Sequence, residues 1–354
     1  YDAVSNITDM FDQTDSTRNQ HYDYDSLYRL IAADGQYGHV EYDYDSVGNR
    51  LARRITADDV IANLVESYDY AHDSNRLNAV AQHSSTHSSQ RLFDYDAVGN
   101  IVNDERAADT NLALLYGANN RLQGVSKNGD DNNESAYRYN AKGQRVAKQV
   151  QQVDGSLKTV HFHYNSAGQM IAETDAEGKA IKEYVYAGSM RVAEINYRKS
   201  DANGQLVYIH NDHLGTPKMM MDEHKTIVWK DNVLPFGQQV ASISPEIQKM
   251  MFPGQYWDGE TGYSQNYFRD YDSSTGRYVQ SDPIGLGGGL NTYGYVGGTI
   301  DKLESPSFRI EAVYGADVVA SSDSVIAVIA GLIGSLVRQQ QGTRGFRFGF
   351  HEEQ

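Results

Sequence analysis

A short aromatic motif recurs eight times in the first half of the chain, and this repeat limits the fold more than any other feature. Each copy places an aromatic residue, or leucine in one copy, two positions before a tyrosine, and turn residues follow. The anchoring tyrosines lie 20 to 26 residues apart: Tyr24, Tyr44, Tyr70, Tyr95, Tyr116, Tyr139, Tyr164 and Tyr186. A period of this length predicts one supersecondary unit that is stacked many times.

Each unit is predicted to be a β-hairpin. In Y-x-Y the two aromatic side chains share one face of a strand, and the residue between them faces water. The following D-x-x-G-N or N-x-x-G-Q supplies a turn, because glycine adopts positive φ and Asp or Asn bonds to nearby backbone. Since a single hairpin is barely stable in water, successive hairpins must pair into one long, twisted sheet that can wind around a space. The tyrosines are interpreted as core and cross-strand partners, with a carbohydrate-binding aromatic ladder as the alternative.

Composition excludes several classes of function. The 354 residues carry 31 Lys and Arg against 47 Asp and Glu, a net charge of −16, which argues against nucleic acid as a partner. The absence of cysteine excludes disulfides, zinc–thiolate sites and a cysteine nucleophile. His210 and His213 flank an Asn-Asp pair, but this segment is interpreted as a polar turn, and neither a metal nor a cofactor is expected.

The pattern Y-D-Y-D-x-x-G-N-R-L, at residues 42–51, resembles the YD repeat of Rhs proteins, of the C component of insecticidal Tc toxins and of teneurins. In those families the repeats form a β-strand spiral that closes into a hollow shell. The resemblance covers residues 1–298 and implies a mainly β fold. We expect a spiral of YD-repeat hairpins over residues 1–206, a core that closes the shell over 207–298, and a variable tail over 299–354.

The second half of the chain carries a denser signature, which resembles the Rhs repeat-associated core. Its matching elements are H-N-D-H-L-G-T-P (210–217), P-F-G (235–237), G-Q-Y-x-D-x-E-T-G-Y (254–263), R-x-Y-D-x-x-x-G-R-Y (269–278), S-D-P-I-G-L (281–286) and N-x-Y-x-Y (291–295). In bacterial relatives this core plugs the shell and holds an aspartic protease-like site, which releases a C-terminal segment, usually a toxin, by self-cleavage.

The resemblance implies Asp270 and Asp282 as the acid pair of that site, with Arg269 as a supporting charge. Two carboxyl groups hydrolyse a peptide when one is ionised and activates water while the other is protonated and donates to the leaving group. The local hairpin is predicted to place Asp270 opposite Val279, so the chain must bend back to bring Asp282 near. The alternative is that Asp282-Pro283 is only a turn and that Arg269 and Asp270 form a surface pair.

The tail departs from the family pattern. Relatives carry a second D-P-x-G-L motif after N-x-Y-x-Y, and this chain has none. Residues 325–337 lack charge but are shorter than the ~20 residues that span a membrane, so a buried or interfacial helix is expected and a membrane span is not. The tail is interpreted as a remnant segment, with a membrane-active cargo fragment as the alternative. The first residues, which resemble neither a start nor a signal segment, are expected to lie inside a longer protein.

The resemblance implies that this chain is the C-terminal shell portion of a bacterial Rhs-type polymorphic toxin, which encapsulates a C-terminal effector and releases it by aspartic-type self-cleavage. Its expected partners are its own C-terminal effector segment, a secretion or injection machinery, and an immunity protein for the cargo. Its expected location is the cell surface or the secreted fraction. Two alternatives remain open at this point: a cell-surface adhesion or carbohydrate-binding module without catalysis, and a displaced, inactive Rhs end.

Overall fold

The computed structural model describes residues 1–13, 15–56, 63–106, 110–128, 135–197, 204–240 and 248–298. The chain divides into a first unit, Tyr1–Phe308, and a second unit, Arg309–Gln354. The predicted variable tail, 299–354, with its uncharged run, lies outside the described residues. In the part of the chain that is described, no helix is long and apolar enough to cross a membrane.

Twenty strands of the first unit form one antiparallel sheet, called the wall below, in which each strand pairs with the next along the chain. Its first ten strands are β1 (Asp9–Met10), β2 (Gln20–Tyr24), β3 (Leu30–Gly35), β4 (Gly38–Tyr44), β5 (Arg50–Thr56), β6 (Leu64–Tyr70), β7 (Leu77–Ser84), β8 (Ser88–Tyr95), β9 (Ile101–Glu105) and β10 (Leu112–Tyr116). The other ten are β11 (Leu122–Lys127), β12 (Ser135–Tyr139), β13 (Arg145–Gln151), β14 (Leu157–Tyr164), β15 (Met170–Thr174), β16 (Ala180–Ala187), β17 (Met190–Asn196), β18 (Gln205–Asn211), β19 (Pro217–Asp222) and β20 (Ile227–Lys230). The predicted mainly β fold is confirmed.

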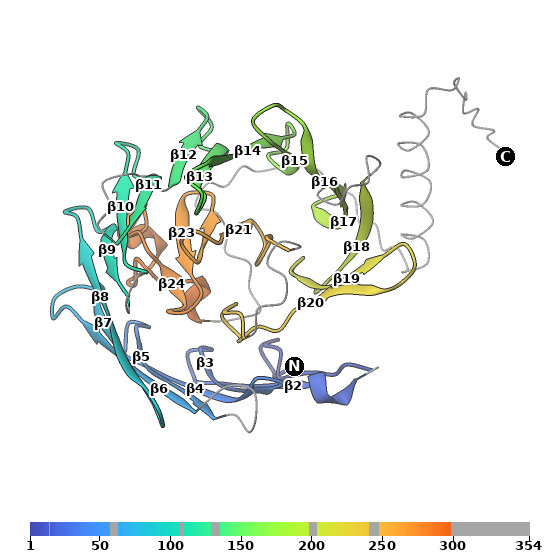
Figure 1. Ribbon diagram of the computed structural model, residues 1–354. Coiled ribbons are helices and arrows are strands. Elements are labelled where there is room, and N and C mark those ends of the chain that lie inside the picture. Colours follow the sequence, from blue (N-terminus) through green and yellow to red (C-terminus); the bar gives the residue numbers. More distant parts are fainter. Residues whose placement is uncertain are drawn as a thin grey trace, which may run out of the picture. The chain divides into compact units, whose positions relative to one another are not determined.

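A second, four-stranded antiparallel sheet, the inner sheet, follows the wall in sequence. Its strands are β21 (Gln255–Asp258), β22 (Tyr263–Asn266), β23 (Arg269–Asp272) and β24 (Arg277–Tyr278). Short 3-10 turns complete the described elements: η1 (Ser16–Arg18), η2 (Gly285–Gly288) and η3 (Val296–Gly298). Figure 1 shows the wall curving around the inner sheet. Among the described residues no pairing joins β20 back to β1, so the wall is open rather than closed.

The repeat turns that begin with Asp or Asn are closed by their own side chains, as the hairpin prediction requires. In the β4–β5 turn, Asp45 N–H donates to the Asn49 carbonyl at 2.9 Å, and Asn49 Nδ2 donates to Asp45 Oδ2 at 2.9 Å. Gly48 adopts φ +86° in this turn, a conformation that disfavours other residues. The Asp96–Asn100 turn repeats the same bonds. These two hairpins therefore close through contacts within five residues of sequence.

The repeat tyrosines curve the wall and connect its repeats. The pairing register shifts at all eight of them, a bulge that increases local twist. As predicted, Tyr42 is buried while the neighbouring Asp43 is exposed. Several second tyrosines also donate to a backbone carbonyl one repeat earlier: Tyr70 to Arg50, Tyr95 to Leu77, Tyr139 to Leu122, Tyr164 to Arg145 and Tyr186 to Met170, all at 2.9–3.1 Å.

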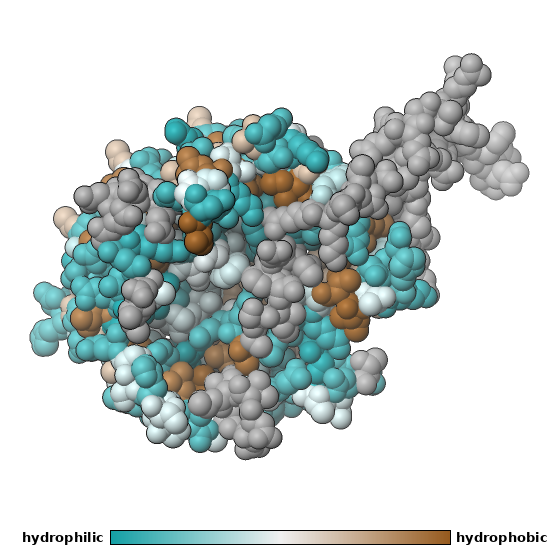
Figure 2. Space-filling model, in the orientation of Figure 1, coloured by the Kyte–Doolittle hydropathy of each residue, from teal (hydrophilic) through white to brown (hydrophobic). Residues whose placement is uncertain are grey.

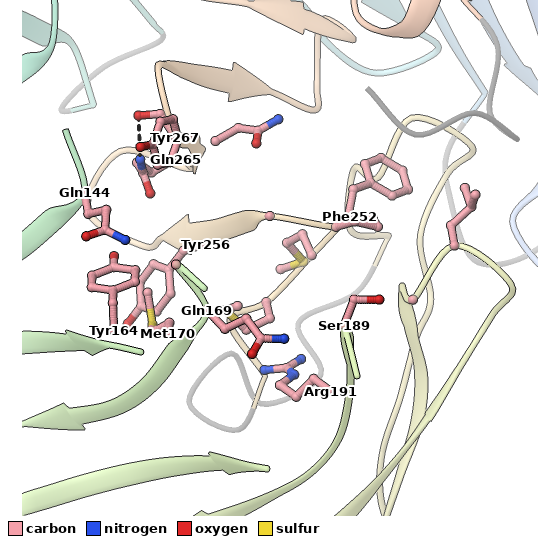
Figure 3. A pocket seen from close by; sticks show the side chains of 18 of the residues that line it. Gln144, Tyr164, Gln169, Met170, Ser189, Arg191, Phe252, Tyr256, Gln265 and Tyr267 are labelled. Atoms are coloured by element: carbon pink, nitrogen blue, oxygen red, sulfur yellow. Dashed lines mark hydrogen bonds between the residues drawn. The ribbon is translucent and has the colours of Figure 1, made fainter. Parts of the chain in front are cut away.

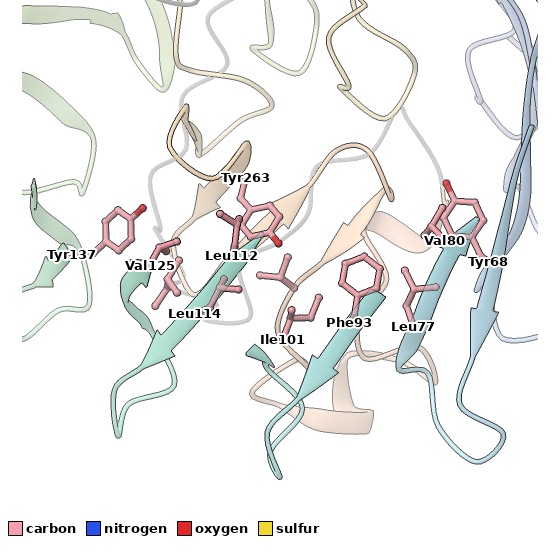
Figure 4. Close-up of a cluster of buried hydrophobic side chains, with 12 residues drawn as sticks. Tyr68, Leu77, Val80, Phe93, Ile101, Leu112, Leu114, Val125, Tyr137 and Tyr263 are labelled. Atoms are coloured by element: carbon pink, nitrogen blue, oxygen red, sulfur yellow. The ribbon is translucent and has the colours of Figure 1, made fainter. Parts of the chain in front are cut away.

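The hydrophobic core lies on the concave face of the wall and includes the inner sheet. Its largest cluster joins wall residues from β6 to β12 with Tyr263 of β22 and with Val279. Figure 4 shows these side chains in a row along the wall strands, with Tyr263 of the inner sheet lying over the middle of the row. Figure 2 shows that the surface seen in this view is mostly hydrophilic, with small hydrophobic patches. The inner sheet therefore shares its hydrophobic core with the wall.

The predicted division of the described part at residues 206 and 207 remains a prediction. The wall continues past it, because β18 pairs with β17 and is followed by β19 and β20. The separate inner sheet begins at Gln255.

Candidate functional site

The predicted acid pair lies on and just after the inner hairpin of β23 and β24. Tyr271 pairs with Tyr278, and the Val279 N–H donates to the Asp270 carbonyl at 2.9 Å. This register places Asp270 opposite Val279, as the sequence predicted. Arg269 and Asp270 are neighbours in one strand, so their side chains leave opposite faces of it.

Asp282 is brought back to Arg269. The Arg269 Nη2 lies 3.1 Å from Asp282 Oδ2, and the guanidinium lies 3.7 Å from the centre of the Tyr278 ring. The other carboxylate oxygen of Asp282 accepts the Ile284 N–H at 3.0 Å, and the Asp282 N–H donates to the Thr292 carbonyl at 2.8 Å. The chain therefore bends after β24, and the bend delivers Asp282 to the arginine.

Asp270 has a different partner. Its Oδ2 accepts from Gln280 Nε2 at 2.7 Å, and its N–H donates to Gln280 Oε1 at 2.7 Å. Burial raises the pKa of Asp270 to about 6, although the Gln280 hydrogen bond and the positive charge of Arg145 oppose this. The structure thus joins Arg269 to Asp282 and Asp270 to Gln280.

Two clusters of buried charges, which the sequence analysis missed, bind the inner sheet to the wall. The first is centred on Asp258 of β21, which accepts from Arg145 Nη2 at 3.0 Å and from Lys148 Nζ at 2.7 Å. Glu260 also accepts from Lys148 at 3.0 Å. Burial alone would raise the pKa of Asp258, but the two cations hold it below its ordinary value of 3.8.

The second cluster is centred on Asp104 of β9. Arg91 and Arg106 each approach its carboxylate to 2.6 Å, and the Tyr263 hydroxyl of the inner sheet donates to it at 2.5 Å. Arg91 also lies 2.8 Å from Asp272 of β23. The wall partners in the two clusters lie more than a hundred residues from the inner sheet, and no local sequence signal pairs them. The only sequence signal for these clusters is that Asp258, Glu260 and Asp272 fall within the core signature.

A cavity of about 770 Å³ separates the inner sheet from one end of the wall hairpins. The wall side is formed by the turns that follow β12, β14, β16 and β18, and the other side by the segment before β21 and the β22–β23 turn. Figure 3 shows Gln144, Gln169 and Arg191 on one side of it and Phe252 and Tyr267 on the other, with Tyr256 beside Tyr164 and Met170. Among the described residues that line this cavity, three are arginines, one is His213, and none carries a carboxylate.

The described residues contain no group of three His, Asp or Glu side chains placed to hold a metal ion. His210, one of the two histidines weighed for a metal, is an exposed residue of β18.

The comparisons with known proteins agree with this architecture. The family model described as Teneurin YD-shell matches residues 53–200, and the model described as RHS protein matches residues 206–241. The chain is similar to Toxin protein Tse5 of Pseudomonas aeruginosa, with 27% identity over 77% of this chain and 26% of that protein. It is also similar to Double-stranded DNA deaminase toxin A of Burkholderia cenocepacia, with 26% identity over 78% of this chain and 21% of that protein.

Solved structures show the same fold. A crystal structure of TcdB2-TccC3 matches 84% of this chain and 18% of the solved chain, with a TM-score of 0.57 and 16% identity. The match therefore covers about a quarter or less of each of these relatives. The aromatic repeat, the open curved wall around an inner sheet, and the two family models lead to one conclusion: the chain is an Rhs- and YD-repeat shell-like protein that is related to polymorphic toxins.

Proposed function

We propose that this chain is the part of a toxin shell that encloses a C-terminal effector segment and keeps it away from the cytosol of the producing cell. The observation that carries the proposal is the wall itself, which curves around an inner sheet and leaves a cavity between the two. The names of two relatives, which call them toxins, support it.

The architecture suits a container for two physical reasons. A sheet whose strands pair only with their sequence neighbours extends by adding repeats, so its enclosed space grows without a new fold. The buried charge clusters anchor the inner sheet on the concave side, where it can plug the enclosed space. On this proposal the further partners are a secretion or injection machinery and an immunity protein for the cargo, and the assembly acts outside the producing cell.

Enclosure is tested by protease protection. A permanently unfolded reporter is fused after Gln354 and digested with proteinase K, and its cleavage rate is compared with that of the same reporter mixed in trans with the unfused chain. Enclosure predicts slower cleavage of the fused reporter only, because the protease cannot reach a segment inside the shell. We expect the rate to fall by about tenfold or more, which corresponds to about 1.4 kcal/mol of protection. Equal rates in the two samples would contradict the proposal.

We propose limited self-cleavage as a second function of the same core. Asp270, buried with a pKa of about 6, would supply the protonated carboxyl, and Asp282, paired with Arg269, would supply the carboxylate that activates water. Asp270 and Arg269, the partner of Asp282, leave opposite faces of β23, so self-cleavage requires a rearrangement that brings both acids to one peptide bond.

Intact-mass analysis tests self-cleavage. The parent chain is compared with Asp270→Asn and Asp282→Asn, and with Asp222→Asn, on an exposed wall turn, as a matched control. We expect the parent and the control to lose about 6 kDa, the share of residues 299–354 in 39.5 kDa, while both site variants stay whole. A parent chain that stays whole while folded by circular dichroism would remove this function and leave the shell.

A further inference from the structure

We propose that the cavity between the wall turns and the inner sheet binds a polypeptide segment that carries a carboxylate beside aromatic or aliphatic side chains. This inference rests on the proposed enclosure, because it states which chemistry of an enclosed guest the wall would hold. It concerns a surface separate from the acid pair, except that Arg269 borders both.

The size and construction of the cavity suit a ligand. Its volume, about 770 Å³, falls within the roughly 300–1,000 Å³ of typical ligand sites. Repeated hairpin turns form one side, so similar positions from successive repeats face the same space. Gln144 and Gln169 occupy the same position in two such turns, and Figure 3 shows both at the cavity wall.

The charge of the cavity favours an anionic guest. The chain as a whole carries −16, yet the described lining residues include three arginines and a histidine without any acid. Arg145 and Arg269 already pair with Asp258 and Asp282 outside the lining, so the attraction for an anion falls to Arg191. Arg191 is 6% exposed, and its Nη1 makes no hydrogen bond within the described structure, with the Glu194 carboxylate 3.8 Å away. A buried guanidinium with an unused donor is stabilised by an added anion, since unmade buried hydrogen bonds carry a free-energy penalty.

The remaining lining favours a peptide over a sugar. Met170, Met250, Met251 and Phe252 supply soft, apolar surface that can adapt to side chains of different shape. Amide side chains such as Gln265 can both donate to and accept from a peptide backbone. The methionines and Phe252 can contact apolar side chains of different shape, and the amides can bind any peptide backbone. This lining therefore suits a guest that has acidic and apolar residues but no single fixed sequence.

Calorimetric titration of the full chain tests this inference. The probes are a short soluble peptide that alternates glutamate with phenylalanine and leucine, and the same peptide with lysine at every glutamate. We expect the glutamate peptide to bind more tightly by about tenfold or more. Ser189→Trp, at an exposed turn position that lines the cavity, should weaken this binding by a similar factor because the indole fills the mouth.

The matched control is Ala176→Trp, on an exposed turn outside the cavity lining, which should bind like the parent. Equal binding of both peptides, or undiminished binding by Ser189→Trp, would overturn the proposal. Binding of trigalacturonate in place of the glutamate peptide would also overturn it and favour a carbohydrate site. If the fused reporter is not protected but the glutamate peptide still binds and Ser189→Trp weakens that binding, enclosure alone is rejected. If the reporter is protected but the peptide does not bind, only the role of the cavity is rejected.

Discussion

The wall and the inner sheet are held in place by interactions of different range. A wall turn such as Asp45 to Asn49 closes on itself, and the Tyr70 hydroxyl reaches a carbonyl only one repeat away. The inner sheet instead depends on partners far along the chain, since Asp258 is 113 residues from Arg145. The comparison teaches that one chain can combine a modular, locally specified wall with an element whose position depends on distant charges.

This difference in range has an energetic consequence. Removing one wall contact leaves neighbouring repeats to hold the sheet, because each repeat interacts mainly with its neighbours. Removing one partner of a buried ion cluster leaves an uncompensated charge in a dry environment. Substitutions in the inner clusters should therefore have larger effects than substitutions in the wall, and four predictions follow in order of expected size.

The largest effect is expected for Asp258→Ala, which leaves Arg145 without its carboxylate partner and Lys148 with Glu260 alone. We expect a loss of about 3–5 kcal/mol in the free energy of unfolding. Urea unfolding followed by tryptophan fluorescence measures it, with Trp257 reporting the inner sheet and Trp229 the wall. The wall-turn control Asp175→Ala should lose about 1 kcal/mol. Equal losses for the two variants would erase the distinction between the regions.

The second prediction concerns the pH dependence of stability within the inner sheet. Because burial raises the folded pKa of Asp270 from 3.8 to about 6, its contribution is full below pH 3.8 and is lost as pH rises through about 6. Asp270→Asn should therefore increase stability near pH 8 by up to about 3 kcal/mol and change it little near pH 3.5.

Urea midpoints at the two pH values measure the Asp270→Asn effect. Asp258 has the opposite sign, since its lowered pKa gives stability that is present above pH 3.8 and lost as pH falls through its folded value. An Asp270→Asn effect of the same size at both pH values would show that the carboxyl does not titrate as described.

The third prediction compares two repeat tyrosines. Tyr139→Phe removes the hydrogen bond to the Leu122 carbonyl and should lower the free energy of unfolding by about 1 kcal/mol. Tyr116→Phe should be neutral or slightly stabilising, because the buried Tyr116 hydroxyl makes no hydrogen bond within the described structure. Thermal unfolding of both variants measures the difference, and a larger loss for Tyr116→Phe would reject the role assigned to the tyrosine–carbonyl bonds.

The smallest effect is expected on the outer face of the wall. Arg54 pairs with Asp43 at 2.5 Å and with Glu41 at 3.8 Å, but all three side chains are exposed. Arg54→Gln should therefore change the free energy of unfolding by less than about 1 kcal/mol, and added salt should reduce the change further. A loss comparable to that of Asp258→Ala would contradict the contrast between exposed and buried charges.

Much of the wall could be predicted from the sequence because its determinants are local. The turn at Asp45, the inward face of Tyr42 and the exposed Asp43 all follow from turn chemistry and from the two-residue period of a strand. The register of the inner hairpin could also be predicted, since its turn residues place Asp270 opposite Val279. These features need no knowledge of the rest of the chain.

The candidate site could be predicted only in part. The resemblance named Arg269 as a supporting charge, and the structure pairs it with Asp282. The partner of Asp270, Gln280, was missed, as were the clusters around Asp258 and Asp104. An isolated sequence contains no signal for which distant cation meets which buried acid, because that pairing depends on how far the wall has curved.

By itself the sequence determined the repeat, the hairpin in each repeat and the sheet that these hairpins must form, because alternation and turn geometry act over a few residues. The tertiary structure decided that the wall stays open, that it continues through β20, and that the inner sheet is anchored by buried charges. It also decided the raised pKa of Asp270 and the acid-free lining of the cavity. Burial and charge proximity are properties of the assembled chain, so only the three-dimensional arrangement could set them.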